Sequence, residues 1–246
     1  MKAMYEASTW LDLALYDTPT ISNAIEPFNQ RLYTEGFCTE MGVREVGHGR
    51  SIVGRAVTAT MRSRTRPTGD PITVFGALYE QVHLAEEPVV VVVEDLDDPP
   101  GLGAYLGEVQ GTILSRLGAV GLVTNGAVRD LEQLRHLGFG AFAACVTVSH
   151  AYAHLEEVGV PVEVGGLRVE SGDVLHADEH GVLSIPYKVV PRVATAAAAV
   201  VAAEQEVVNW VRSPAFEYRS LVPRLRTIGS KIAEAVQSMS DGPEEH

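Results

Sequence analysis

The sequence is short of cysteine, of basic charge and of long apolar runs, and each shortage excludes a class of protein. Its 246 residues include two cysteines, Cys38 and Cys145, too few for a cysteine metal site or a disulfide framework. The 32 Asp and Glu residues exceed the 19 Lys and Arg residues, and the net charge of −13 argues against nucleic-acid binding. The longest uncharged apolar run, residues 193–203, is shorter than the about 20 residues of a membrane span. Because Glu6 also interrupts any signal-peptide core, we expect a cytoplasmic protein that binds neither nucleic acid nor membranes.

Lysine is the scarcest of the basic residues. Among the 19 Lys and Arg residues, only Lys2, Lys188 and Lys231 are lysines. An aldolase that forms a Schiff base needs a lysine desolvated enough to lower its pKa. Lys2 is terminal, Lys188 follows a proline at the end of a predicted strand, and Lys231 lies in a polar helix. The sequence therefore argues against Schiff-base chemistry.

Strand and helix patterns alternate through the middle of the chain. Runs rich in β-branched residues predict strands, and apolar residues at helical spacing predict helices. The predicted strands are 51–60, 88–93, 120–124 and 141–148, and the predicted helices are 74–83, 107–117 and 128–137. This order is typical of an α/β domain with a parallel sheet.

After residue 160 the pattern changes to short strand pairs and then to helices. Residues 162–164 and 166–169 predict one pair of strands, and 174–177 with 181–185 predict a hairpin. Residues 193–211 and 221–239 predict helices. We expect a single α/β domain over residues 1–212, followed by a helical extension and polar tail over 213–246.

Two segments have the residue types of a chemical site. Gly107-Glu108-Val109-Gln110 begins a predicted helix, and Asn125-Gly126-Ala127-Val128-Arg129-Asp130 follows a predicted buried strand. Gly107 and Arg129 are 22 positions apart, which is enough for one helix, a turn and a strand. In a parallel α/β arrangement this length returns the chain to the same edge of the sheet, so both segments could face one crevice.

Several residues of these segments suit an acidic ligand. The free backbone N–H groups of Gly107, Glu108, Val109 and Gln110 could bind a carboxylate at the helix N-terminus. Arg129 offers a planar, permanently charged fork for a carboxylate or a developing enolate. Asp130 could ligate a hard cation such as Mg²⁺, and Glu108 could hold or deliver a proton through water.

The motifs that surround these residues resemble the RraA-like family. They comprise Gly107-Glu108, the run Gly121 to Asp130, Gly165-Gly166-Leu167-Arg168-Val169, Gly172-Asp173-Val174 and Ala177-Asp178-Glu179-His180-Gly181-Val182. The similarity covers roughly residues 17–210. The family contains 4-hydroxy-4-methyl-2-oxoglutarate/4-carboxy-4-hydroxy-2-oxoadipate aldolases and the regulator of ribonuclease activity A.

The resemblance implies a metal-dependent, class II type lyase that cleaves a carbon–carbon bond. A 4-hydroxy-2-oxo acid would be cleaved to pyruvate, with oxaloacetate decarboxylation as a side activity. The amides of Gly107–Gln110 and the side chain of Arg129 would bind the substrate, and Asp130 would hold Mg²⁺ or Mn²⁺. Glu108 matches a position thought to support protonation of the enolate.

The resemblance also has consequences for the fold and assembly. It implies a three-layer sandwich of sheets and helices like that of the swivelling phosphohistidine domain, assembled as a homotrimer or homohexamer with sites at subunit boundaries. Glu204 or Glu206 could then reach a neighbouring subunit. The chain departs from many relatives at Asn23, where they have Asp, and over residues 62–70.

Several alternatives to this interpretation follow from the same residues. Asp130 and Gln133 also fit a helix capping box. His150 and His154 have the spacing of two ligands on one helical face, although packed or exposed histidines are more common. The acidic run 94–98 could line the crevice or form a solvated loop.

Besides the aldolase, the resemblance allows two other functions. The chain could be a non-catalytic regulator of a protein partner such as an endoribonuclease. A methyltransferase acting on a menaquinone precursor is disfavoured, because the sequence has no convincing glycine-rich cofactor loop.

Overall fold

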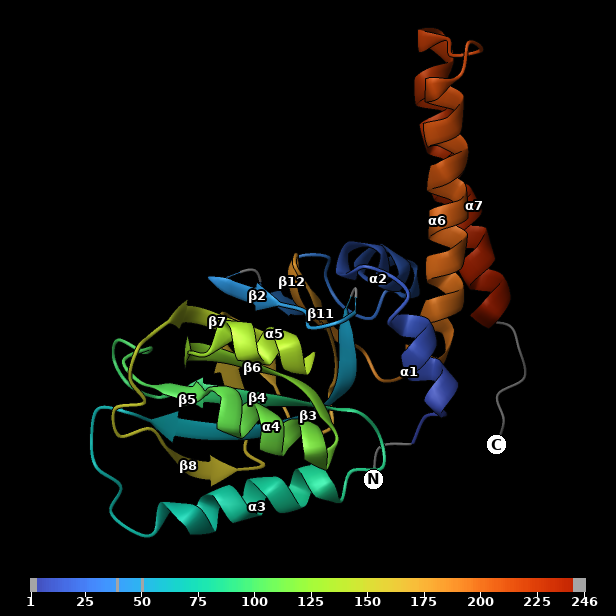
Figure 1. The fold of residues 1–246 in the computed structure, drawn as a ribbon. Helices are drawn as coiled ribbons and strands as arrows, with labels where there is room; N and C mark the ends of the chain where they lie inside the picture. Colours follow the sequence, from blue (N-terminus) through green and yellow to red (C-terminus); the bar gives the residue numbers. More distant parts are fainter. Residues whose placement is uncertain (1–3, 39, 50, 241–246) are drawn as a thin grey trace.

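The computed structural model describes residues 4–38, 40–49 and 51–240. One large mixed sheet dominates it, with strands in the order β1-β12-β11-β3-β4-β6-β7-β2, while β5 pairs with β6 and β8 with β3 (Figure 1). A separate two-stranded sheet contains β9 and β10. The strands are β1 (Phe37–Cys38), β2 (Val43–Glu45), β3 (Ile52–Arg62), β4 (Val89–Asp95), β5 (Ala104–Leu106), β6 (Ala119–Val128), β7 (Gly140–Val146), β8 (His154–Val158), β9 (Val162–Val164), β10 (Leu167–Val169), β11 (Val174–Asp178) and β12 (Gly181–Ile185).

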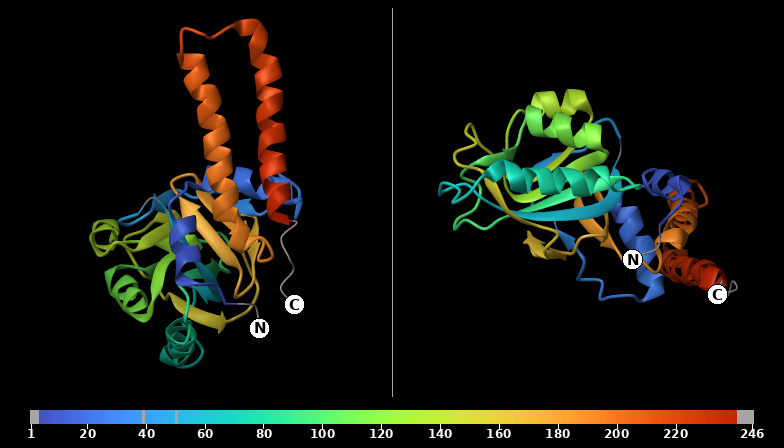
Figure 2. Two further views of the ribbon diagram at one scale, coloured as in Figure 1. Left: turned by 90° about the vertical axis from the view of Figure 1, so that its right-hand side faces the viewer. Right: turned by 90° about the horizontal axis from the view of Figure 1, so that it is seen from below.

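Three helices connect the parallel strands at the centre of the sheet. They are α3 (Pro71–His83), α4 (Glu108–Leu117) and α5 (Leu131–Leu137), which link β3, β4, β6 and β7 in chain order and cover one face (Figures 1 and 2). The run of valines makes both faces of β4 apolar, so that this strand can be buried on both sides. Val89, Val91 and Val93 pack in the core beneath these helices. Val90 and Val92 belong to the core on the opposite face, with the β9–β10 hairpin.

The remaining helices pack beside the antiparallel end of the sheet. They are α1 (Ala7–Leu13), α2 (Thr18–Ile25), the 3-10 turns Glu26–Phe28 and Tyr218–Ser220, α6 (Val190–Arg212) and α7 (Leu221–Ser240). Trp10, Ile21 and Val193 form a third core with Leu183 of β12. Beyond this core, α6 and α7 run side by side as a hairpin that projects from the body of the molecule (Figures 1 and 2).

The expected α/β architecture is confirmed, with local differences. The predicted strands and helices all have counterparts, but β6 extends through Val128, so the helix expected over 128–137 begins only at Leu131. The helical spacing of His150 and His154 is misleading, because His154 begins the strand β8. The sequence patterns do not predict the helices α1 and α2 or the strands β1, β2, β5 and β8. The domain boundary at residue 212 stays a prediction.

Candidate functional site

The two segments with chemical residues meet at one edge of the sheet. β5 pairs in parallel with the end of β6, with Leu106 opposite Val128. The backbone N–H of Arg129 continues this pairing by donating to the carbonyl of Leu106 at 3.0 Å. The expectation that the spacing returns the chain to the same edge is therefore confirmed.

The Asp130 side chain is fixed to the start of α4. Its Oδ2 accepts a hydrogen bond from the backbone N–H of Glu108 at 3.0 Å. Asp130 has a left-handed backbone (φ 56°), which Asp tolerates better than most residues, and its side chain makes no capping bond to α5. The capping-box alternative is therefore wrong, since this carboxylate serves the neighbouring helix.

Gly107 allows the two segments to approach this closely. A Cβ atom at position 107 would lie 2.6 Å from Oδ2 of Asp130 and 3.1 Å from Cγ of Arg129. The first distance is well inside van der Waals contact. Any larger residue would therefore displace the Asp130 carboxylate from its position against α4.

Arg129 contacts Asp130 and lines a pocket. Its Nε lies 3.6 Å from Oδ2 of Asp130, and the two side chains are 37% and 35% exposed. The guanidinium therefore keeps free donors that face solvent or a ligand. A pocket of about 240 Å³ opens beside it, lined by Phe75, Ala104, Tyr105, Gly107, Val109, Gln110, Arg129, His150 and Ala153.

The N-terminus of α4 lines this pocket with Gly107, Val109 and Gln110. Of the four amides expected to bind a carboxylate, that of Glu108 is engaged by Asp130. The backbone N–H of Gly111 donates to the Gly107 carbonyl at 2.9 Å, and Val109 and Gln110 come before it in the first turn of the helix. Their N–H groups have no intrahelical acceptor, and the helix dipole favours an anion there.

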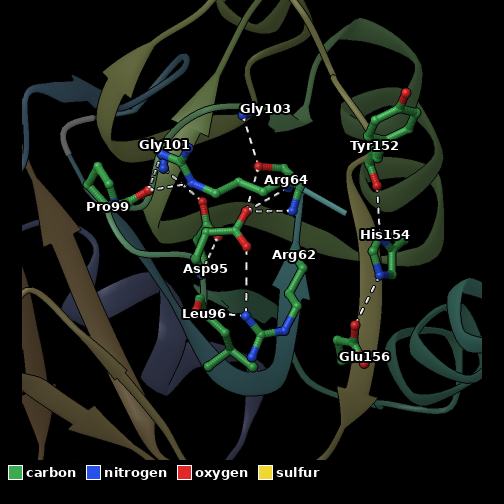
Figure 3. A network of polar contacts seen from close by, with 12 residues as sticks. Arg62, Arg64, Asp95, Leu96, Pro99, Gly101, Gly103, Tyr152, His154 and Glu156 are labelled. Carbon is green, nitrogen blue, oxygen red and sulfur yellow. Dashed lines mark hydrogen bonds and ion pairs between the residues drawn. The ribbon is translucent and has the colours of Figure 1, made fainter. Parts of the chain in front are cut away.

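A hydrogen-bonded loop holds β5 in place. Asp95, at the end of β4, accepts bonds from the N–H groups of Gly101 at 2.8 Å and Asp97 at 3.1 Å, and burial raises the pKa of its carboxyl (Figure 3). The Asp97 carboxylate binds both the N–H and the hydroxyl of Ser63, and that hydroxyl accepts from Gly103 N–H at 3.1 Å. Gly103 directly precedes β5, so this network positions the strand that lines the pocket.

The other acids and histidines considered in the sequence lie outside this site, with one exception. Glu94 accepts from the backbone N–H of Glu163, and the ring of His154 lies between the Tyr152 carbonyl and Glu156 (Figure 3). The acidic run 94–98 therefore supports loops and does not line the pocket. His150 does line it.

The C-terminal acids have partners within the chain. Glu204 accepts from Asn23 Nδ2 at 3.3 Å, and Glu206 pairs with Lys231 at 2.6 Å. Lys188 and Lys231 are the lysines within the described residues, and neither lines the pocket; Lys2 lies outside the described part of the chain.

The donor set suits a hard cation bound by few protein groups. Within the described part of the chain, no three His, Cys, Asp or Glu side chains gather into a metal site. Asp130, next to the pocket residue Arg129, offers a carboxylate whose Oδ1 is not used by the bond to Glu108. Mg²⁺ is commonly held by one or two carboxylates and keeps several waters, so Asp130 fits such a role.

Sequence reasoning missed the aromatic side of the pocket. Phe75 and Tyr105 line it, with ring centroids 5.9 Å apart, and Tyr79 donates a hydrogen bond to Gln110. These residues come from α3 and from the three-residue strand β5. Neither element has a motif, so their approach to Arg129 follows only from the tertiary fold.

Known proteins are similar to parts of this sequence. A 4-hydroxy-4-methyl-2-oxoglutarate aldolase of Thermus thermophilus is 38% identical over 91 residues, which are 35% of this chain and 56% of that protein. A relative from Halalkalibacterium halodurans is 28% identical over 145 residues, covering 58% of this chain and 64% of its own length. The matches thus span less than two thirds of both relatives.

Solved structures share the fold at low sequence identity. An uncharacterized protein of Pseudomonas syringae pv. tomato superposes with a TM-score of 0.70 at 19% identity, over 92% of this chain and 97% of its own. Streptomyces coelicolor RraAS2, described as an unusual member of the RNase ES inhibitor RraA family, gives 0.64 at 20% identity, over 85% and 99%.

No helix among the described residues is long and apolar enough to cross a membrane.

The family match covers most of the chain. The model of the RraA-like family, described as Aldolase/RraA, matches residues 18–184, which contain both segments of the site. The chain belongs to the RraA-like family.

Proposed function

We propose that this protein is a divalent-metal-dependent aldolase that cleaves a 4-hydroxy-2-oxo acid to pyruvate. The observation that carries the proposal is that Arg129 and the N-terminus of α4 line one pocket, while Asp130, next to Arg129, is hydrogen bonded to the first residue of α4. The aldolase name of the Thermus relative, whose match covers part of each chain, supports the same chemistry.

The substrate carboxylate would bind between Arg129 and α4. The guanidinium offers two parallel donors that match a carboxylate, and the N–H groups of Val109 and Gln110 add neutral donors at the positive end of the helix dipole. This arrangement orients the 2-oxo acid with its reacting carbons in the pocket. A lysine at position 129 would keep the charge but lose the fork.

Asp130 would hold the metal ion, and Glu108 N–H fixes the direction of its carboxylate. A bound Mg²⁺ or Mn²⁺ would supply a Lewis acid that stabilises the negative charge developing on the 2-oxo oxygen. The charge of Arg129 acts on the same developing anion, because it lies next to Asp130 in a partly buried pocket.

The bond changes are those of a retro-aldol cleavage. The C4 hydroxyl loses its proton to water, the C3–C4 bond breaks, and its electron pair forms the enolate of pyruvate while C4 becomes a carbonyl. We assign the return of a proton to C3 to Glu108, acting through water. Glu108 begins α4 directly before two residues that line the pocket. Oxaloacetate decarboxylation would pass through the same enolate.

The test is metal-dependent release of pyruvate by purified protein. Oxaloacetate and 4-hydroxy-2-oxo acids are supplied with Mg²⁺, Mn²⁺ or EDTA, and enzyme-free reactions correct for decarboxylation by the metal alone. We expect release that requires the metal and is lost in Asp130→Asn. Folded protein that releases no pyruvate above the controls would overturn the proposal and favour a protein-binding regulator.

A further inference from the structure

His150 is an exposed residue in the lining of the pocket, so a ligand there can reach its ring. Its loop follows β7, and Arg129 follows the parallel neighbour β6, in which Val128 lies opposite Val146 of β7. Ligands of α/β proteins bind beyond the carboxyl ends of such strands. The two side chains therefore come to one pocket from the ends of adjacent strands.

The loop that carries His150 is fixed to the start of β5. The backbone N–H of Ala104, the first residue of β5, donates to the Ser149 carbonyl at 2.9 Å. A Cβ atom at Gly103 would lie 2.5 Å from the His150 carbonyl, so a side chain there would push the loop away. The strand that lines the pocket thus also holds the backbone of His150 in place.

The turn directly after His150 has an uncommon conformation. Ala151 has a left-handed backbone (φ 48°), which is rare for a residue with a Cβ atom, and its N–H donates to the Ser149 hydroxyl at 2.9 Å. The N–H of Ala153 donates to the His150 carbonyl at 2.8 Å. Strained backbone positions of this kind are concentrated at functional sites. The turn therefore directs attention to the side chain beside it.

The ring of His150 is fixed in one tautomer. Its Nδ1 lies 2.7 Å from the Ala151 carbonyl, which can only accept, so Nδ1 carries a proton. In the neutral ring the lone pair is then on Nε2, which has no hydrogen-bond partner among the described residues. An imidazole takes up and releases a proton at neutral pH, whereas Arg129 and Gln110 in the same lining cannot act as a base.

We propose that His150 is the general base of the cleavage, and that its Nε2 takes the proton of the C4 hydroxyl through the water that first receives it. The C3–C4 bond breaks as this proton leaves, its electron pair forms the enolate, and C4 becomes a carbonyl. The imidazolium then gives its proton to solvent. Glu108 returns a proton to C3 and regains one from solvent, so the turnover is balanced. This inference rests on the proposed aldolase function and assigns one of its steps.

Two reactions that share the enolate separate this step from the others. The cleavage substrate is the better one of 4-hydroxy-4-methyl-2-oxoglutarate and 4-hydroxy-2-oxopentanoate, and its C4 hydroxyl must lose a proton. Oxaloacetate has no such hydroxyl and loses CO₂ instead. In His150→Gln, with Mg²⁺ present, we expect kcat for cleavage to fall at least about 100-fold, while decarboxylation stays close to the wild-type rate. Glu108→Gln should instead slow both reactions, because both end with protonation of the enolate.

His150→Ala provides a second test, because it leaves space for an added base. Imidazole in the buffer should raise the cleavage rate of this variant and leave that of the wild type unchanged. His136→Gln is the matched control, since it makes the same change at an exposed residue of α5 outside the pocket. It should act on both compounds like the wild type.

The two proposals fail in different ways. Wild-type cleavage by His150→Gln would overturn the role of His150 while the aldolase stands. So would equal losses of cleavage and decarboxylation that imidazole does not restore, because a structural residue gives this result. Wild-type protein that cleaves neither hydroxy acid would overturn the aldolase and, with it, this inference.

Discussion

The carboxylate of Asp130 lies 3.0 Å from the backbone N–H of Glu108, and this hydrogen bond joins the segment that follows β6 to the start of α4. The bond uses one oxygen of a side chain whose own backbone is left-handed. It therefore fixes the carboxylate beside the pocket while the second oxygen remains for another partner.

Asp130→Asn should abolish metal-dependent turnover and preserve the fold. The amide oxygen can still accept from Glu108 N–H, and Asn also tolerates the left-handed backbone, so only the charge is lost. We expect pyruvate release to fall by at least about 100-fold, with a Tm close to that of the wild type. Asp130→Ala loses the bond as well and should melt at a lower temperature. Wild-type turnover by the Asn variant would show that Asp130 is not a metal ligand.

Gly107→Ala should damage the site without removing any functional group. The new Cβ would lie 2.6 Å from Asp130 Oδ2, so the carboxylate must move and its bond to Glu108 must lengthen. We expect weaker metal binding, measured by calorimetry with Mn²⁺, and at least about a tenfold loss of kcat. Gly69→Ala is a matched control, because its Cβ would meet no atom within 4 Å. Equal metal affinity in both variants would show that the close approach is unimportant.

Arg129→Lys should weaken substrate binding although the charge is conserved. An ammonium cannot form two parallel bonds with a carboxylate. We expect kcat/KM for the 2-oxo acid to fall by about tenfold or more, with most of the change in KM. A variant with nearly wild-type kcat/KM would make Arg129 a structural residue.

Stability should decrease at mildly acidic pH because of His176. Burial lowers the pKa of this histidine to about 4, while its ring nitrogens lie 2.9 Å from Thr18 Oγ1 and 3.3 Å from the Leu13 carbonyl. The nearby charges of Asp178 and Asp17 oppose this shift. The unfolded chain takes up the proton at about pH 6.5, so stability is complete above that pH and declines as the pH falls toward 4.

The loss between pH 7 and pH 5 should be about 2 kcal/mol in the free energy of unfolding. Urea unfolding at the two pH values measures it, and NMR titration of His176 measures the pKa directly. A histidine that titrates near pH 6.5 in the folded protein would contradict this account.

Tyr105→Phe should stabilise the ligand-free protein or leave its stability unchanged. The wild type buries a hydroxyl that has no partner among the described residues, and the variant removes the cost of that burial. We expect the free energy of unfolding to rise by up to about 1 kcal/mol in urea titrations. A loss of more than about 1 kcal/mol would mean that the hydroxyl is hydrogen bonded in solution.

The sequence predicts those parts of the molecule whose signals are local. The valines of β4 and the glycines that end α4 and α5 mark their elements clearly, since Gly118 and Gly138 both adopt the left-handed conformation there. The spacing of Gly107 and Arg129 also predicts their meeting correctly. In each case one short segment carries the information.

The remainder depends on contacts between distant segments. The spacing of Asp130 and Gln133 does not predict the role of Asp130, because its carboxylate accepts a hydrogen bond from Glu108 N–H and does not cap α5. β5 has three residues and no periodicity, yet it brings Tyr105 to the pocket. His154 has helical spacing to His150 but pairs in a strand with β3.

The α6–α7 hairpin changes how the size of this protein must be measured. With 23 residues, α6 is roughly 35 Å long, and much of it extends beyond the compact body (Figure 2). Friction in water rises with such elongation, so gel filtration against globular standards would give too large an apparent mass. A monomer could then elute like a small oligomer, and a trimer like a hexamer. Light scattering or sedimentation equilibrium, which respond to mass and not to shape, are the measurements that count its subunits.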